Sequence, residues 1–378
     1  MLSRRSLLRS AALSAGVSLG APMINRGRFS LFAQDRFAQS QLGKDNDTYS
    51  TRAVDLVHQT TVIDMLGLLT LNYRKLSDWE ENPARFQPAD FLRLRSSGIT
   101  IFHPAVGYTS GDIYAESLRD ITGWNRFLAA HPSQFLRVDC AADFARAKSQ
   151  DKIGILIGQQ NSEHFRGVDD VNRFYDLGQR VSQLTYTGNR IGGGSSDARD
   201  IGLTPYGAHI VERMNAVGMA VDVSHCGDRT TLDAIEASSK PVLVTHSNCR
   251  ALVPGVARCK TDEAIARMAA KGGVMGITMV RAFVGSTPRI TIDNVLDHMQ
   301  RVASLVGVEH VGVGSDVDLD GRDLAGGRSR SYDLDGINYT KKIYDVTEGL
   351  VRRNFSSRDI ELILGGNFQR ALGEAWKA

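Results

Sequence analysis

Eight short apolar runs, rich in β-branched residues, recur along this chain, and most are followed by a segment with helical periodicity. Near-continuous apolar strands that alternate with helices are typical of parallel strands buried on both faces. Eight such strands predict a closed (β/α)8 barrel of the TIM type. The runs are residues 62–69, 99–106, 153–159, 180–186, 219–225, 241–247, 273–280 and 311–316.

Helical periodicity is clearest at residues 206–217, 262–271 and 293–306. A helical tail after Val346 extends the barrel, so we predict one barrel domain over residues 35–378. An open doubly wound sheet is the structural alternative. It is weakened because no G-x-G-x-x-G dinucleotide fingerprint follows the first apolar run.

The N-terminus has a different character. Arg4 and Arg5 precede a weakly apolar run at 10–24 that is rich in Ala, Ser and Gly. This pattern predicts a twin-arginine export signal over residues 1–34 and a periplasmic location, with a disordered basic arm as the alternative. The run is too short to serve as a permanent membrane span. Residues 1–34 contain five arginines and no acidic residue, so their removal lowers the formal charge from +3 to −2. No basic tract favours nucleic acid as a partner.

Two histidines close two successive apolar runs, His225 in MAVDVSHCGD and His246 in PVLVTHSNCR. Each follows a hydroxyl residue, Ser224 or Thr245. The carboxyl ends of barrel strands are where this fold keeps its chemistry. A single histidine there is more often structural, but imidazole is a common zinc ligand and a pair on neighbouring strands favours a metal site.

Two further residues complete the candidate site. Asp316 ends the eighth run, in VGVGSDVDLDG, where it could present a carboxylate or help to bind a cation. Arg258 lies in the loop after His246. Its planar guanidinium suits bidentate recognition of a carboxylate.

The stretch 153–321 resembles the membrane (renal-type) dipeptidases, a metal-dependent branch of the amidohydrolase-like barrels. The motifs that carry this resemblance are LTYTGNR, GLTPYGAHIVERMNAVGMAVDVSHCGDRT, PVLVTHSNCRAL, ARCKTDEAIARMAAKGGVMGI and VEHVGVGSDVDLDG. The resemblance implies a (β/α)8 barrel, usually a homodimer, that hydrolyses dipeptides with two bridged zinc ions.

Four residues match the family's functional positions. His225 and His246 correspond to the two histidines that hold one of the metals. Arg258 corresponds to the arginine that binds the free carboxylate of the substrate, and Asp316 to the carboxylate that moves a proton near the scissile bond.

The remaining positions depart from the family pattern. The first run reads D-M-L-G-L, so Leu66 and Leu68 stand where the family has a histidine and an aspartate that bind the other metal. Gln160 replaces the bridging glutamate, and Tyr186 replaces the histidine that polarises the substrate carbonyl. Asp64 could be a replacement ligand, although a structural role is the simpler interpretation.

These substitutions favour one zinc ion over two. His225, His246 and the amide oxygen of Gln160 would hold that ion, and the Tyr186 hydroxyl would contact the carbonyl oxygen. The resulting hypothesis is an exported metallohydrolase that cleaves a small dipeptide-like amide with a free carboxylate. The alternatives are a repurposed non-hydrolytic or metal-free enzyme acting on a small carboxylate, and a non-catalytic periplasmic binding protein.

Overall fold

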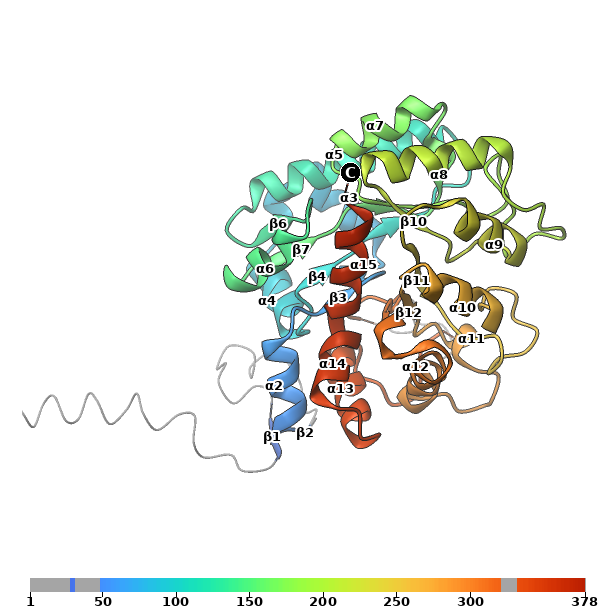
Figure 1. Ribbon diagram of the computed structural model, residues 1–378. Helices are drawn as coiled ribbons and strands as arrows, with labels where there is room; N and C mark the ends of the chain where they lie inside the picture. Colours follow the sequence, from blue (N-terminus) through green and yellow to red (C-terminus); the bar gives the residue numbers. More distant parts are fainter. Residues whose placement is uncertain (1–27, 31–47, 321–331, 378) are drawn as a thin grey trace, which may run out of the picture. The chain divides into compact units, whose positions relative to one another are not determined.

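The computed structural model describes residues 28–30, 48–320 and 332–377 (Figure 1). The chain divides into two compact units, Met1–Asp55 and Leu56–Ala378. In the first unit, β1 (Arg28–Ser30) pairs antiparallel with β2 (Thr48–Ser50). Most of the predicted export signal at 1–34 lies outside the described residues.

The second unit is built on one parallel sheet in the order β5-β8-β9-β10-β11-β12-β13-β3-β4-β7-β6. Its strands are short because only a few residues of each apolar run hold ladder hydrogen bonds. They are β3 (Ile63–Asp64), β4 (Ile101–Phe102), β5 (Ala105–Val106), β6 (Phe135–Arg137), β7 (Ile153–Ile155), β8 (Gly158–Gln159), β9 (Val181–Gln183), β10 (Ala220–Asp222), β11 (Val242–Ser247), β12 (Met275–Ile277) and β13 (Val311–Val313).

The pairings close this sheet into a ring. β4 and β5 are two halves of the second barrel strand, and β7 and β8 are two halves of the third. From β9 the paired strands run through β10, β11, β12, β13 and β3 to β4. β4 pairs with β7, and β8, the other half of the same barrel strand as β7, pairs with β9, which closes the ring. The result is an eight-stranded barrel with β6 as an added strand beside β7. The predicted (β/α)8 fold is therefore confirmed, and each of the eight apolar runs contributes one barrel strand.

The helices begin and end at local signals that can be seen in the sequence. For α8 (Pro205–Val217), the Thr204 hydroxyl accepts a hydrogen bond from Gly207 N, and Gly218 ends the helix in the left-handed region at φ 82°. A threonine cap, a proline in the first turn and a terminal glycine are the residues expected at these positions.

The three helices predicted most clearly are confirmed as α8, α10 and α12. The α-helices are α2 (Thr51–Gln59), α3 (Tyr73–Glu81), α4 (Pro88–Ser96), α5 (Ile113–Ala130), α6 (Ala142–Ser149), α7 (Val168–Asp176), α8, α9 (Asp228–Ala237), α10 (Asp262–Ala270), α11 (Arg281–Val284), α12 (Ile292–Val306), α13 (Lys342–Arg352), α14 (Ser357–Glu361) and α15 (Asn367–Ala375). Shorter 3-10 turns occur at η2 (Pro83–Arg85), η3 (Ser162–His164), η4 (Val308–His310) and η5 (Tyr339–Lys341), and η6 (Leu362–Gly366) is a π-turn that leads into α15.

The C-terminal tail covers the amino-terminal face of the barrel. Figure 1 shows α15, in red, running across in front of the strands, and Arg370 on this helix donates to Gly272 O, just ahead of β12, at 2.8 Å. A Cβ placed at Gly312 of β13 would lie 2.2 Å from the Phe368 ring, so only glycine permits this approach. The core cluster at this face joins residues of the strands to residues of the tail: Ile63, Ile101, Val181, Ala220, Leu243, Val274, Phe368, Ala371, Leu372 and Ala375.

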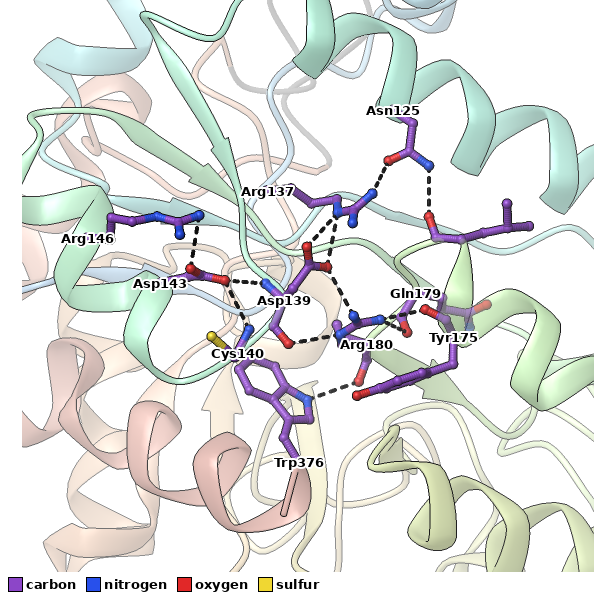
Figure 2. Close-up of polar contacts among 11 residues, drawn as sticks. Asn125, Arg137, Asp139, Cys140, Asp143, Arg146, Tyr175, Gln179, Arg180 and Trp376 are labelled. Atoms are coloured by element: carbon purple, nitrogen blue, oxygen red, sulfur yellow. Dashed lines mark hydrogen bonds and ion pairs between the residues drawn. The ribbon is translucent and has the colours of Figure 1, made fainter. Parts of the chain in front are cut away.

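Polar contacts strengthen the same face (Figure 2). Arg180, which precedes β9, donates to the backbone oxygens of Asp139 and Tyr175 at 2.9 and 2.7 Å and pairs with the Asp139 carboxylate at 3.2 Å. The Trp376 indole in turn donates to Arg180 O at 3.4 Å. This network joins the tail, β9 and the loop after β6, which leaves the opposite face for chemistry. In the described part of the chain, no helix is long and apolar enough to cross a bilayer.

Candidate active site

The candidate residues meet at the carboxyl ends of the strands, as the sequence predicted. Tyr186 and His225 each lie three residues beyond the end of β9 and β10, and His246 lies within β11. Gln160 follows β8 directly, and Asp316 lies three residues beyond β13. Each comes from a different strand, so the closed barrel is what gathers them.

The two histidines are in direct contact. Nε2 of His225 lies 3.0 Å from Nε2 of His246, and the ring planes are inclined at 58°. Burial lowers the pKa of both imidazoles well below the usual value, and the nearby charge of Arg258 lowers it further. Both rings are therefore neutral at physiological pH, which is the form that binds metal ions.

A buried carboxylate orients His246. Asp222, at the end of β10, accepts hydrogen bonds from N and Oγ of Ser224 at 3.0 and 2.6 Å and from N and Oγ1 of Thr245 at 3.0 and 2.7 Å. Because the Thr245 hydroxyl gives its only proton to Asp222, its oxygen accepts from Nδ1 of His246 at 2.8 Å. The proton therefore sits on Nδ1, and the Nε2 lone pair of His246 faces His225.

Tyr186 supports the pair from the cavity side. Its ring stacks on His225 with a centroid separation of 4.2 Å and an inclination of 22°. A Cβ at Gly107 would lie 2.5 Å from the Tyr186 ring, so a glycine is required for the ring to occupy this position. Tyr186 is thus fixed beside the histidines, where its hydroxyl is a candidate hydrogen-bond donor to a substrate.

Asp316 stands on a strained turn. It is one of three described non-glycine residues with positive φ, at 57°, and its backbone N donates to Leu66 O at 2.9 Å. Left-handed backbone in a non-glycine residue is tolerated best by Asp and Asn and recurs at functional sites. The turn anchors the carboxylate of Asp316 between β13 and the first barrel strand.

Arg258 contacts the backbone beside the histidine pair. It is buried, with Nη1 donating to Ser224 O at 2.6 Å and Nη2 to His246 O at 2.8 Å, and its guanidinium lies 5.4 Å from the Phe283 ring centroid. Its Nε is buried without a partner in the described residues. In this arrangement Arg258 fixes the backbone on both sides of the histidine pair, and its role in binding a substrate carboxylate stays a prediction.

The first barrel strand carries no metal ligands at the two family positions. Leu66 is fully buried, and Leu68 faces the cavity. Asp64 lies deeper, where its carboxylate accepts from N and Oγ of Ser315 at 2.7 and 2.5 Å and lies 3.4 Å from Nζ of Lys342. These contacts give Asp64 a structural role, in line with the simpler of the two interpretations.

The histidine pair has a spacing that fits a metal ion. Two imidazole nitrogens on a tetrahedral zinc, at about 2.0–2.1 Å each, lie roughly 3.3 Å apart, close to the 3.0 Å between the histidines. Gln160 donates through Nε2 to Ala105 O at 2.8 Å, so the amide oxygen is the end of this side chain that could bind a metal ion. Among the described residues, no group of three His, Cys, Asp or Glu side chains is placed to hold a metal. At the two family positions for the ligands of the other ion, the described chain has Leu66 and Leu68, whose side chains cannot bind a metal.

Two features of the site were missed by sequence reasoning. One is Asp222, which the D-x-S-H spacing could have revealed, since alternation points Asp222 and Ser224 to the same side of the strand. The other is Lys260, which is buried and donates to Cys226 O and Thr231 Oγ1 at 2.8 and 3.0 Å. Burial lowers the pKa of Lys260 to about 8. No local pattern marks a lysine that becomes buried only when distant loops pack around it.

A cavity of about 330 Å³ opens onto these groups. Its polar lining includes Gln160, Tyr186, His225 and Asp316, together with Thr70 and Tyr332. Much of the remaining lining is apolar and includes Leu68, Leu69, Leu76, Val106, Trp124 and Phe283. The volume suits a small molecule.

Behind this lining, α3 carries a partly buried carboxyl, Glu80, and α5 carries a buried one, Asp120. Glu80 packs against Gly123, whose added Cβ would lie 3.0 Å from the Glu80 Cβ, and Asp120 accepts from Gln159 Nε2 at 2.6 Å. Burial raises the pKa of Glu80 to about 8, with a further contribution from Asp120, and burial raises the pKa of Asp120 to about 7. The Glu80 carboxyl is therefore protonated at neutral pH.

The raised pKa values of these carboxyls make the free energy of unfolding depend on pH. Between pH 4.5 and about 8 the unfolded chain ionises Glu80 while the folded chain keeps it protonated, so the pair lowers stability as the pH rises through that window. We expect Glu80→Gln to stabilise the protein at pH 8 by on the order of 2 kcal/mol, with a smaller effect at pH 5. Thermal unfolding at both pH values measures this. Glu236→Gln, at an exposed position of α9 that does not act on the Glu80 pKa, is the control. Equal shifts for Glu80→Gln at both pH values would refute the assignment.

The comparisons agree with this architecture. A barrel that gathers two imidazoles, a phenol and a carboxylate at the carboxyl ends of its strands has the layout of the amidohydrolase-like enzymes. The profile of the membrane dipeptidases (Peptidase family M19) matches residues 50–378, and the chain belongs to that family. The family is one of metallopeptidases, which implies a metal cofactor, typically zinc.

Individual relatives give the same picture. Dipeptidase tcpJ of Claviceps purpurea is 28% identical over 274 residues, which cover 70% of this chain and 62% of that protein. The chain thus spans about three-fifths of that relative's length. An amidohydrolase from Pseudomonas aeruginosa superposes with a TM-score of 0.74 at 29% identity, covering 86% of this chain and 99% of that one. A Rhodobacter sphaeroides metallo peptidase, solved with a phosphinate mimic of L-Ala-D-Ala, superposes at 0.70 with 18% identity over 84% of this chain and 99% of that one, which supports the fold.

Proposed function

We propose that this protein is a metal-dependent hydrolase that cleaves a small dipeptide-like amide with a free carboxylate, using one metal ion. The observation that carries the proposal is the contact between Nε2 of His225 and Nε2 of His246, on a cavity that also holds Asp316. Bound by the two imidazoles and the Gln160 amide oxygen, the ion would act as a Lewis acid that acidifies water and polarises a carbonyl.

The residues of the chain have separate roles in this reaction. Asp316 takes a proton from the attacking water and returns it to the leaving amine, which is the work of a general base and then a general acid. The Tyr186 hydroxyl donates a hydrogen bond to the carbonyl oxygen as negative charge develops there. Asp222, through Thr245, holds the proton of His246 on Nδ1, so the Nε2 lone pair would be available to a bound ion.

A second candidate function is favoured by the surroundings of the pair. Arg258 and Lys260 are buried cations whose charges already lower the pKa of both histidines, and they oppose a further positive charge at this position. A metal-free reaction on a small carboxylate, with Asp316 and Tyr186 as the acid and base groups, is therefore the alternative.

Metal analysis joined to a hydrolysis assay separates the two functions. We expect about one equivalent of zinc after loading, loss of dipeptide hydrolysis with a chelator, and recovery when zinc is restored. His225→Ala should lose both the zinc and the hydrolysis, whereas His209→Ala, at an exposed histidine of α8, should lose neither. Less than a tenth of an equivalent of zinc, with activity that survives chelation, would refute the one-metal reaction and support the alternative. Ligand-induced stabilisation without turnover on a broad substrate panel would indicate a binding protein.

A further inference from the structure

Five apolar side chains line one part of the cavity, and we call this set the apolar lobe: Leu68, Leu69, Leu76, Val106 and Trp124. Leu68 and Leu69 follow β3, Leu76 lies on α3, Val106 ends β5, and Trp124 lies on α5. The two strands are neighbours in the barrel, and α3 packs on α5. The lobe is therefore one patch of the wall, built by the first two β/α units.

His225 stands across the mouth from the Leu68 end of this patch, whereas Gln160 and Asp316 border it. β3 is the first strand of the ring and β10 is the fifth, so in an eight-stranded barrel the end of β10, with His225, lies opposite the end of β3, with Leu68. Tyr186 on the fourth strand lies beside His225. A small molecule that reaches His225 and Tyr186 with its reacting group thus turns its far side toward the apolar lobe.

The lobe repels charge and attracts apolar surface. None of its five side chains carries a charge or a carboxylate, and Leu68 stands where the family places an aspartate. An ion or an ammonium group brought against these carbons would lose its hydration without gaining a partner. An apolar side chain would gain by leaving water.

We infer that the apolar lobe is a subsite that binds one apolar side chain, of the size of leucine or phenylalanine, on the substrate. The inference rests on the proposed function, because it assumes that the amide reacts at the opposite, polar edge of the cavity. The whole cavity measures about 330 Å³, which suits a small molecule. The lobe is only a part of this volume, so it has room for one side chain of that molecule. Substrates with glycine at that position fill the lobe poorly and leave its wall exposed.

The first measurement compares matched dipeptides. Leu-Gly, Gly-Leu and Gly-Gly, with the phenylalanine counterparts, are compared by kcat/KM. Full burial of a leucine or phenylalanine side chain predicts a preference of about 10- to 100-fold over glycine at one of the two positions. The preference should lie in KM, because the lobe binds a part of the substrate that does not react.

A matched pair of variants tests where the preference arises. Leu76→Ala removes part of the lobe, and it should reduce the preference for leucine over glycine, measured as the ratio of kcat/KM values, about five- to tenfold. Leu92→Ala, at a leucine of α4 that is 48% exposed, should leave the preference as it is. Thermal unfolding confirms that both variants are folded.

Binding of free amino acids separates this inference from the proposed function. L-leucine, L-phenylalanine and glycine cannot be hydrolysed, and calorimetric titration of the purified protein with each reports the lobe alone. Tighter binding of leucine and phenylalanine than of glycine would support the lobe. If, in addition, no dipeptide is hydrolysed, the hydrolase is refuted and the lobe still stands. Hydrolysis with equal kcat/KM for the leucine and glycine series, and equal binding of the free amino acids, would overturn the lobe and leave the hydrolase standing.

Discussion

Asp316→Asn should lower kcat for a dipeptide-like substrate by about 10²- to 10⁴-fold, with KM nearly unchanged, because an amide cannot accept and return the proton. Asparagine tolerates the left-handed backbone that Asp316 adopts at φ 57°, so the turn that joins β13 to Leu66 O is preserved. Steady-state kinetics of the wild-type protein and the variant measure the effect.

The control for this substitution is Asp297→Asn, on α12, where the carboxylate pairs with Arg353 and is half exposed. It should leave kcat within a factor of two. If Asp316→Asn keeps kcat within threefold of the wild type while its thermal unfolding is unchanged, Asp316 does not move the proton. The pH profile adds a second readout, because the variant should lose the acidic limb that Asp316 contributes.

Lys342→Met should lower the free energy of unfolding by about 3–5 kcal/mol, the largest stability effect that we expect. Lys342 and Asp64 are both fully buried, with Nζ 3.4 Å from the carboxylate and 2.8 Å from Val317 O. Burial lowers the pKa of the Lys342 ammonium, and the Asp64 charge opposes that shift. Removing the lysine leaves the Asp64 carboxylate charged and buried with only the Ser315 contacts.

Urea unfolding of three variants measures this pair. The double variant Asp64→Asn/Lys342→Met should recover part of the loss, because no unpaired charge remains. Lys75→Met breaks an ion pair of the same kind with Asp90 near the surface, at 2.6 Å, and should cost at most about 1 kcal/mol. Equal losses for Lys342→Met and Lys75→Met would show that burial does not set the strength of the inner pair.

Much of the fold could be predicted because its signals are local. Thr204, Pro205 and Gly218 mark the ends of α8 without reference to any other part of the chain. The apolar runs that became strands are buried on both faces of the sheet, so their composition identifies them directly. The added strand β6 (Phe135–Arg137) was not predicted, because three residues beside β7 carry too little pattern.

The candidate site divides in the same way. His225, His246 and Asp316 were placed at strand ends by their positions in apolar runs, and their meeting at one mouth follows from a parallel barrel. The role of Arg258 was less accessible, since its hydrogen bonds run to Ser224 O and His246 O, 34 and 12 residues away. The orientation of His246 could not be predicted from the sequence either. It depends on the hydrogen bond that the Thr245 hydroxyl donates to Asp222, which lies on the neighbouring strand β10.

The amino-acid sequence by itself determined the strand and helix order, the barrel and the edge of it that carries polar side chains, since these depend on periodicity between residues a few positions apart. Only the tertiary structure decided that Lys342 faces Asp64, that Arg258 turns to the backbone, and that Leu68 faces a cavity opposite His225. Those outcomes depend on burial and charge between segments far apart in the chain, and such segments meet only after the ring of strands has closed.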